Sequence, residues 1–408
     1  MRTGLSSLTL RGRAFVAAGV TAIGCAVLFG QPALTRIGVL VLVLPLIAAI
    51  VVGRRRHDPI VRRTVLPRLV RAGESARIEL TVHSGRRRAD GALLVEDTLP
   101  YALGGRPRFV LQGLGREWER SVTYPVRSDV RGRYVVGPLV VRIADPFGLV
   151  EVRRTIPGTA DLTVTPRVLP LPAIPLAGGW QGSGEHRPQA FAAGSAEDAS
   201  VREYRRGDEL RRVHWRSSAR MGDLMVRREE QPWEARATVL LDNRLLAHRG
   251  RGLASSFEAA VVAAASVVVH LQQHGYAVRL ATATGGEAVG AEDSLNHLAV
   301  LGTTARPTLD LSWCGEQARG GVVVAVLGGH AAGDTATLRR IRHDAGVALA
   351  VVLDVEQWST SRSMTDPAAA ASPLMAMAWR ATVVGPRDRL DSAWRDLGRS
   401  HVRAGAPG

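Results

Sequence analysis

Residues 203–220 read EYRRGDELRRVHWRSSAR and bring acids, a histidine, serines and closely spaced arginines into one short segment. Side chains of these types can support three kinds of chemistry. Asp208, His214 and Ser217 or Ser218 are the residue types of a nucleophilic triad. The arginines can neutralise the phosphates of a nucleic acid. Alternatively, planar guanidinium groups can pair with carboxylates and carbonyls and fix the segment to the rest of the fold.

The spacing does not favour the first two interpretations. Residues this close together on one helix or turn project side by side, so nothing holds a serine against a base with an oxyanion hole opposite. A nucleic-acid site needs a basic face, but Glu203, Asp208 and Glu209 lie among the arginines. The aromatic residues that could stack on bases are only Tyr204 and Trp215. We therefore expect neither a catalytic site nor a nucleic-acid site in this segment.

A structural interpretation fits the order of the residues better. Gly207 and Asp208 suit a turn that enters a helix, with Asp208 as the N-cap. Asp208 and Arg212 then lie at i and i+4 and can form a salt bridge, and Arg211 and Trp215 can form a cation–π contact. We expect the segment to lock the linker onto the domain that follows, or to present a docking surface for a partner. The candidate residues for these roles are Arg202, Tyr204, Gly207, Asp208, Arg211, Arg212, His214, Trp215 and Arg220.

A second candidate site begins where an apolar run ends, at LLDNRLL, residues 240–246. In von Willebrand factor A domains this position carries the motif D-x-S-x-S, whose oxygen atoms hold a divalent cation. Asp242 is present, but Arg244 and Leu246 stand at the two hydroxyl positions and cannot be metal ligands. We expect Asp242 to pair with Arg244 or to cap the next segment, with no bound metal and no cofactor. The stretches GTTARP and LGGHAAGD lack phosphate-loop spacing and are interpreted as ordinary loops.

The composition limits the classes of protein to which these segments can belong. A chain of 408 residues is long enough for two or three domains. Its formal net charge is +16, and all 53 of its basic residues are arginines. The two cysteines, Cys25 and Cys314, are too few for a disulfide framework and have no neighbouring ligands for a thiolate metal site.

The N-terminal region predicts two transmembrane helices within residues 14–53. Arg36 is the only charge in this region, and it separates two apolar runs that are each about long enough to span the lipid bilayer. A cleaved signal peptide is the alternative for the first run. Three arginines precede the region and seven lie within residues 54–71, so both ends should face the cytoplasm by the positive-inside rule. We expect a two-pass protein of the cell membrane, with residues 1–13 as a cytoplasmic tail and the soluble domains in the cytoplasm.

The remaining chain divides into three parts by its pattern. Residues 54–165 alternate apolar and polar residues in short runs such as ARIELTVH, which is typical of an antiparallel β-sandwich with immunoglobulin-like architecture. Residues 166–235 begin rich in Pro, Gly, Ala and Ser and then contain the arginine-rich signature segment, so they are interpreted as a linker. Residues 236–403 alternate continuous apolar strands with amphipathic helices. This alternation predicts a doubly wound α/β domain with its ligand crevice at the carboxyl ends of the strands.

These pieces together resemble the bacterial membrane protein family of domain of unknown function 58. The resemblance rests on RAGESARIELTVHSG, RGRYVVGPLVVRIADPFGL and TVTPRVLPLP, and above all on REYRRGDELRRVHWRSSARMGDLMVRREEQ. It implies an N-terminal hairpin, a β domain, the signature segment and a von Willebrand factor A-like α/β domain. It also implies work with AAA ATPases of the MoxR class in chaperone-like or envelope-related processes.

We therefore expect a membrane-anchored, non-enzymatic adaptor or assembly protein with a MoxR-class ATPase as its partner. The alternative is a hydrolase with a site at the strand ends near Asp242, although Arg244 and Leu246 are not catalytic groups. A further alternative is nucleic-acid binding through the arginine-rich segment, which would need those arginines on one exposed face.

Overall fold

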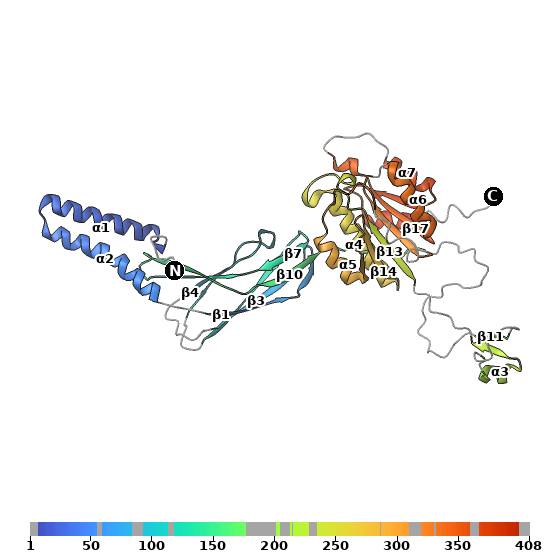
Figure 1. The fold of residues 1–408 in the computed structure, drawn as a ribbon, viewed down its shortest axis with the longest axis horizontal. Helices are drawn as coiled ribbons and strands as arrows, with labels where there is room; N and C mark the ends of the chain where they lie inside the picture. Colours follow the sequence, from blue (N-terminus) through green and yellow to red (C-terminus); the bar gives the residue numbers. More distant parts are fainter. Residues whose placement is uncertain are drawn as a thin grey trace. The chain divides into compact units, whose positions relative to one another are not determined.

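The computed structural model of the chain describes residues 7–54, 59–83, 93–112, 118–176, 201–204, 213, 215–227, 235–285, 287–309, 320–329, 332–359 and 367–399 (Figure 1). The chain divides into two compact units. The first comprises residues 1–168 with 295–301, and the second comprises residues 169–294 with 302–408. The first unit contains two long helices and a β region, and the second contains an α/β sheet.

Two apolar helices begin the first unit, α1 (Leu10–Phe29) and α2 (Pro32–Arg54). Both are long and apolar enough to cross a membrane. Between them Gly30 has a φ of 65°, the left-handed conformation that glycine adopts without strain and that commonly ends a helix. The predicted pair of apolar helices is therefore present, and it fits a membrane anchor.

The close packing of α1 against α2 depends on two glycines. A Cβ atom on Gly19 would lie 3.0 Å from the carbonyl oxygen of Gly38. A Cβ atom on Gly38 would lie 2.7 Å from Cγ1 of Ile23. Larger side chains at either position would push the helices apart, because small residues are what allow two helices to approach closely in a bilayer.

The β region follows the helices and consists of short strands. They are β1 (Ile60–Leu66), β2 (Leu69–Arg71), β3 (Ser75–His83), β4 (Leu93–Asp97), β5 (Arg108–Leu111), β6 (Glu119–Arg127), β7 (Gly132–Val136), β8 (Leu139–Ala144), β9 (Glu151–Ile156) and β10 (Ala160–Thr165), with the 3-10 turn η2 (Tyr101–Leu103) after β4. They form the sheets β1-β3-β6, β2-β10-β7 and β5-β4-β8-β9. Among the described strands of this region, the pairs are antiparallel except β10 with β2. Alternate residues such as Ala76, Ile78 and Leu80 of β3 lie in the core, as the period-two pattern predicts.

A buried ionic network joins three strands of the β region. The carboxylate of Asp97 accepts hydrogen bonds from Nε and Nη2 of Arg63 at 3.1 and 2.6 Å. The hydroxyl of Tyr124 donates to the same carboxylate, and Nη1 of Arg63 donates to the carbonyl oxygen of Gly158 at 2.5 Å. Burial and the neighbouring Asp97 carboxylate raise the pKa of Tyr124, so this hydroxyl remains a donor. Because the Arg63 and Asp97 side chains are 2% and 0% exposed, each depends on the other for its partner.

The second unit contains a six-stranded mixed sheet. Its strands are β13 (Arg236–Leu241), β14 (Ala277–Thr282), β15 (Glu287–Val289), β16 (Val322–Leu327), β17 (Val347–Leu353) and β18 (Arg380–Val384), in the order β15-β14-β13-β16-β17-β18. Neighbouring strands are parallel, except that β15 is antiparallel to β14. Its helices are α4 (Ser256–Gln273), α6 (Thr335–Asp344), α7 (Pro367–Ala376) and α8 (Leu390–Arg399), together with the start of α5 (Gly290–Val300), whose residues from 295 onward belong to the first unit. The 3-10 turns η6 (Ala332–Asp334) and η7 (Val355–Trp358) follow β16 and β17.

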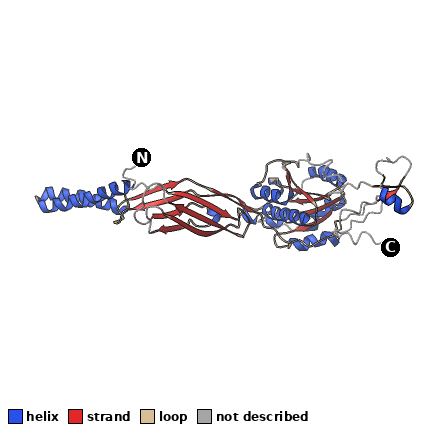
Figure 2. Ribbon diagram, turned by 90° about the horizontal axis from the view of Figure 1, so that it is seen from below, coloured by secondary structure: helices blue, strands red, loops and turns tan. Residues whose placement is uncertain are grey.

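The sheet is covered by helices on both sides (Figure 2), and this explains the continuous apolar runs in its strands. All six residues of β16 are buried, as expected for a parallel strand between two helical layers. If the six strands are numbered 1 to 6 in chain order, their order across the sheet is 3-2-1-4-5-6. The direction of winding therefore reverses between β13 and β16, and such a reversal opens a crevice at the carboxyl ends of the strands.

A proline-rich segment, residues 169–176, runs across α4 and α8 in the second unit. The amide of Leu169 donates to the hydroxyl of Ser266 at 2.9 Å. Nε1 of Trp394 donates to the carbonyl oxygen of Pro172 at 3.1 Å, and Nη1 of Arg380 donates to that of Pro175 at 3.2 Å. The segment predicted to be a linker is thus attached to the α/β sheet along its first residues.

His270 of α4 lies near this segment in a buried environment. The centroid of its ring is 4.2 Å from that of His274 and 5.5 Å from that of Trp394. Burial, and then the neighbouring His274, lower the pKa of His270 from 6.5 to about 4, although a hydrogen bond with the backbone of Leu171 acts in the opposite direction. The folded protein therefore keeps this imidazole neutral at pH values where an exposed histidine is charged.

This histidine should make the second unit sensitive to mild acid. In the unfolded chain, His270 binds a proton below about pH 6.5, whereas in the folded chain it does so only below about pH 4. The free energy of unfolding should therefore fall as the pH falls from about 6.5 to about 4. The expected loss is up to about 3 kcal/mol. Urea unfolding of wild type and His270→Phe between pH 7 and pH 4 should show a smaller loss in the variant. Parallel pH profiles for the two proteins would contradict this assignment.

Candidate functional site

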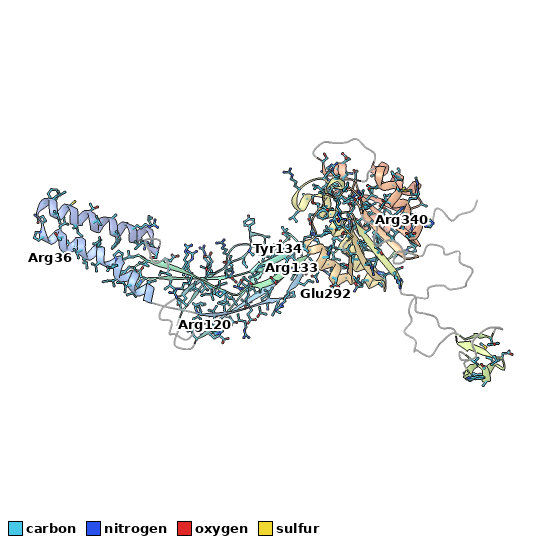
Figure 3. All side chains as sticks on the ribbon, in the orientation of Figure 1. Arg36, Arg120, Arg133, Tyr134, Glu292 and Arg340 are labelled. Carbon is cyan, nitrogen blue, oxygen red and sulfur yellow. The ribbon has the colours of Figure 1, made fainter. Side chains whose placement is uncertain are left out.

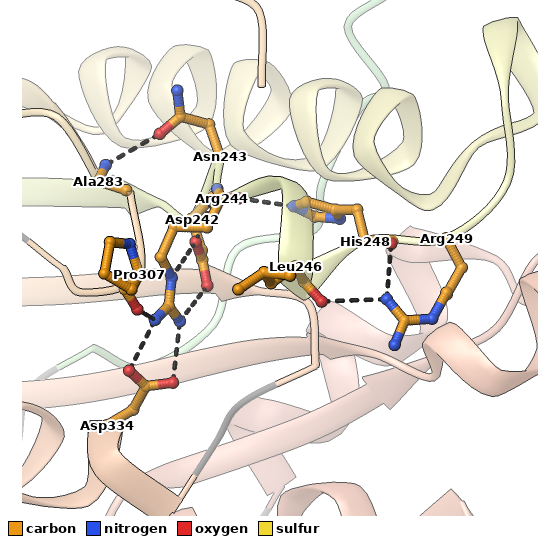
Figure 4. A network of polar contacts seen from close by, with 9 residues as sticks. All are labelled: Asp242, Asn243, Arg244, Leu246, His248, Arg249, Ala283, Pro307 and Asp334. Carbon is orange, nitrogen blue, oxygen red and sulfur yellow. Dashed lines mark hydrogen bonds and ion pairs between the residues drawn. The ribbon is translucent and has the colours of Figure 1, made fainter. Parts of the chain in front are cut away.

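The candidate site lies where β13 ends, at the reversal point of the sheet. Asp242 and Asn243 follow directly after β13, and Arg244 leads into two 3-10 turns, η4 (Leu245–Ala247) and η5 (Gly252–Ala254). Asp242, Asn243 and Arg244 are only 1%, 2% and 4% exposed. Figure 4 shows how their side chains meet those of the neighbouring loops.

Two carboxylates and one carbonyl surround the guanidinium of Arg244. Nε and Nη2 donate to Oδ1 and Oδ2 of Asp242 at 2.9 and 2.8 Å. Nη1 and Nη2 donate to Oδ1 and Oδ2 of Asp334 at 2.7 and 2.9 Å, and Nη1 also donates to the carbonyl oxygen of Pro307 at 2.9 Å. A guanidinium has five N–H groups, and these contacts use all five. We refer to Arg244, Asp242, Asp334 and Pro307 as the Arg244 clamp.

The charges of the Arg244 clamp support one another. Burial by itself lowers the pKa of Arg244, but the hydrogen bonds to Asp242 and Asp334 outweigh burial and raise the pKa. The guanidinium therefore stays charged between the two carboxylates. Oδ1 of Asp242 also accepts the backbone N–H of Arg244 at 3.0 Å, which closes the turn that brings the guanidinium back toward the strand end.

Asn243 connects the strand ends on the other side of β13. Its Oδ1 accepts the N–H of Ala283 at 3.1 Å, just after β14, and its Nδ2 donates to the carbonyl oxygen of Gly302 at 2.9 Å. Thr304 adds two backbone hydrogen bonds, to the carbonyl of Asn243 at 2.8 Å and from the amide of Leu245 at 2.7 Å. The carboxyl ends of adjacent strands are therefore fixed to one another by hydrogen bonds.

His248 and Ser256 hold the loop after β13 from within. Nε2 of His248 lies 2.6 Å from the carbonyl oxygen of Asp242, which can only accept, so Nε2 carries the proton. Nδ1 then accepts from the hydroxyl of Ser256 at 3.1 Å, and that hydroxyl accepts the N–H of Arg249 at 2.9 Å. Burial lowers the pKa of His248, which keeps the ring neutral. Because Ser256 is 0% exposed, this serine–histidine pair cannot reach a substrate and is structural.

The arrangement is that of a closed charge cluster. The carboxylate oxygens of Asp242 and Asp334 face the guanidinium of Arg244, so they are already paired with a cation. Within the described ranges, no group of three or more His, Cys, Asp or Glu side chains is placed to hold a metal ion. This geometry holds the loop that follows β13 in a fixed position.

The sequence predicts part of the Arg244 clamp. The pairing of Asp242 with Arg244 is confirmed. Asp334 and Pro307, however, belong to the stretches LGGHAAGD and GTTARP. They are interpreted as loops, and loops they are, but the sequence does not predict their contacts with Arg244. The available signal was an acid shortly after β16, the strand next to β13 at the reversal point.

The signature segment is described only in part. It contains strands β11 (Val201–Glu203) and β12 (Met225–Arg227), which pair antiparallel, and helix α3 (Trp215–Met221). The backbone of Arg202 lies in β11, and the N–H of Tyr204 donates to the carbonyl of Leu224 at 2.7 Å. Trp215 is 67% exposed at the start of α3, and Arg220 is exposed in its last turn. The other candidates lie outside the described residues: Gly207, Asp208, Arg211, Arg212, His214 and the side chain of Arg202.

The expected continuous helix from Asp208 to Trp215, with a cation–π contact between Arg211 and Trp215, is wrong. A helix entered at Asp208 would have to continue through Val213 to place Arg211 and Trp215 one turn apart. Val213 instead forms a β-bridge and is buried, and α3 begins at Trp215. A β-branched valine suits extended backbone better than helix, which gives the physical reason for the break.

A family match covers the same part of the chain. Residues 200–304 match the family model described as protein of unknown function DUF58. The match supports the resemblance to DUF58 proteins and includes the signature segment, Asp242 and Arg244. It ends before Pro307 and Asp334, the other members of the Arg244 clamp. Among curated proteins, none matches the chain.

Three solved structures show limited similarity to the DUF58-matching chain. The CARDB domain of a Pyrococcus furiosus protein, in complex with di-metal ions, is 20% identical over 26% of this chain and 93% of its own, with a TM-score of 0.20. The alkylpurine DNA glycosylase AlkC of Pseudomonas fluorescens, bound to DNA containing an abasic site analog, is 17% identical over 33% of this chain and 39% of its own, with a TM-score of 0.19. A chain from the human seminal plasma complex of zinc 2-glycoprotein and prolactin inducible protein is 14% identical over 27% of this chain and 98% of its own, with a TM-score of 0.19. Scores this low do not establish a shared fold.

Proposed function

We propose that the chain is a membrane-anchored, non-enzymatic adaptor or assembly protein that works with a MoxR-class AAA ATPase in chaperone-like or envelope-related processes. In this proposal the β region is an immunoglobulin-like sandwich and the mixed sheet is a von Willebrand factor A-like domain. The observation that carries the proposal is the Arg244 clamp, which fills the strand-end site with a paired guanidinium. The DUF58 match supports the choice of partner class, because that choice rests on the resemblance to this family.

The clamp argues against the hydrolase alternative. A general base or a nucleophile at the strand ends must reach the substrate, whereas Asp242 and Asp334 are buried and bound to Arg244. Ser256, the serine that hydrogen-bonds to His248, is fully buried. The nucleic-acid alternative needs the arginines of residues 202–228 on one exposed face. Of these, only Arg220 has a side chain that the structure describes, and it is exposed.

The proposal can be tested with the full chain in nanodiscs and a purified MoxR-class ATPase from the same organism. We expect saturable association and a change in the rate of ATP hydrolysis by the ATPase. The chain by itself should not hydrolyse ester or phosphoester substrates. Absence of association, together with hydrolysis by the chain that Asp242→Asn abolishes, would favour the hydrolase instead.

The proposed anchor is the pair α1 and α2 with both ends in the cytoplasm. The arginine bias supports this orientation, since seven arginines lie within residues 54–71 and Arg36 is the only charge within residues 14–53. Alkaline phosphatase, which is active only outside the cytoplasm, should be silent when fused after Gly408. The same reporter fused after Gln31, between the two helices, should be active. The reverse pattern would overturn the orientation.

A further inference from the structure

The loop after the Arg244 clamp exposes three leucines in a short stretch. Residues 245–254 read LLAHRGRGLA. Leu245, Leu246 and Leu253 are 57%, 71% and 54% exposed. Isolated exposed leucines are ordinary, but several within one loop at the reversal point of an α/β sheet mark an interaction site.

The loop is held in place by contacts on its buried side. The carbonyl oxygen of Ala247 accepts the N–H of Gly329 at 2.7 Å, and Ala247 is only 2% exposed. A Cβ atom at Gly328 would collide with that carbonyl, so glycine is required for this approach. Arg244 on one side and His248 on the other are fixed by the contacts described above. The leucines are therefore presented on a preorganised loop, which lowers the entropy cost of binding a partner.

Two arginines lie in the same loop as the leucines and determine what charge a partner must carry. Nη1 of Arg249 donates to the carbonyl oxygens of Leu246 and His248, each at 3.0 Å, which fixes the guanidinium beside the exposed leucine. Arg251 is exposed in the same loop, and residues 243–257 contain no acid. Within the part of the chain that the structure describes, neither Arg249 nor Arg251 has a carboxylate partner. The surface is therefore apolar and basic at once.

We propose that residues 245–254 form a docking surface for an acidic, amphipathic segment of a partner protein. The apolar side chains of that segment pack on Leu245, Leu246 and Leu253, and its carboxylates pair with Arg249 and Arg251. A second copy of this chain is not the occupant at the same surface, because two such loops would bring like charges together. The proposal rests on the proposed adaptor function and names the surface through which that function is exercised.

The test selects partners for the full chain in nanodiscs of phosphatidylcholine from a library of random peptides. Peptides that bind wild type but not Leu245→Ser/Leu246→Ser should be rich in acidic and large apolar residues. Repeating the selection on Arg249→Glu/Arg251→Glu should return basic amphipathic peptides. Affinities measured by fluorescence anisotropy should fall by about tenfold or more when the charge of the protein is reversed.

The controls separate a surface effect from a folding effect. Met375→Ser, on α7, and Arg340→Glu, on α6, change exposed residues of the same unit and should bind the selected peptides like wild type. Figure 3 shows Arg340 at the surface of this unit. The loop variants should keep the thermal midpoint of wild type, since the altered side chains are exposed.

Three results would overturn the docking proposal. They are selected peptides without acidic enrichment, binding that the loop variants leave unchanged, and association of the loop with phosphatidylglycerol vesicles in place of peptides. The ATPase experiment distinguishes failure of this proposal from failure of the proposed function. If the ATPase binds wild type and the loop variants equally, the docking surface is wrong and the adaptor function stands. If acidic peptides bind but the ATPase does not, the docking surface stands and the partner class is wrong.

Discussion

Arg244→Ala is expected to destabilise the α/β sheet more than any other single change at the strand ends. The substitution leaves the carboxylates of Asp242 and Asp334 buried, facing each other and without their common cation. Removing one partner from a buried ion pair costs about 3–5 kcal/mol, because the remaining charge is neither solvated nor paired. Urea unfolding of the full chain, followed through the second unit, should show this loss. Arg340→Ala, which changes an exposed arginine, should lie within about 0.5 kcal/mol of wild type.

Two further variants identify which property of Arg244 is responsible. Arg244→Lys keeps the charge but loses the planar fork that serves both carboxylates, so it should be destabilised by an intermediate amount. In Arg244→Ala, Mg²⁺ or Mn²⁺ should recover part of the lost stability, since two carboxylates and the carbonyl of Pro307 are oxygen ligands suited to hard cations. The same cations should leave wild type unchanged. An Arg244→Ala protein as stable as wild type would show that the clamp is not a buried ion pair.

Asp97→Ala should have a comparable effect in the β region. The change leaves the guanidinium of Arg63, which is 2% exposed, without its carboxylate, and it removes the acceptor used by Tyr124 and by the N–H of Thr98. We expect a loss of about 3–5 kcal/mol in the free energy of unfolding. Tyr124→Phe removes one donor only and should cost about 1 kcal/mol.

A surface ion pair in the same region provides the control for Asp97. Arg127 and Asp129 lie 3.6 Å apart with side chains 62% and 70% exposed. Asp129→Ala should therefore change the stability by less than about 1 kcal/mol. Equal losses for Asp97→Ala and Asp129→Ala, measured by urea unfolding, would contradict the distinction between buried and exposed pairs in this region.

The main layers of the fold can be predicted from the sequence because each has a strong period. The apolar runs within residues 14–53 predict the two long helices, and continuous runs such as VVVAVL predict the parallel strands. Strand β15 is missed, since its three residues, Glu287–Val289, are too few to show a period. Helix α7 is missed as well. Asp366 and Pro367 are a start signal, but the alanine-rich sequence that follows has no polar face and contains Pro373, a residue that disfavours a helix interior.

The candidate site is only half predictable, because its members are far apart in the chain. Asp242 and Arg244 are two residues apart, so their pairing can be expected from local geometry. Asp334 is 90 residues from Arg244, and only the order of the strands brings them together. The signature segment shows the opposite error. Local helix rules favoured a helix from Asp208, whereas the burial of Val213 in a β-bridge overrides that local preference.

The most direct test of the central claim, that the guanidinium of Arg244 occupies the strand-end site, is Mn²⁺ binding measured by electron paramagnetic resonance on the full chain. Wild type should show no micromolar site, and Arg244→Ser should gain one that disappears in Arg244→Ser/Asp334→Ala. Micromolar Mn²⁺ binding by wild type that Asp242→Ala abolishes would contradict the claim. It would mean that the two aspartates bind a metal ion in solution, and that the strand ends form an open site rather than a closed clamp.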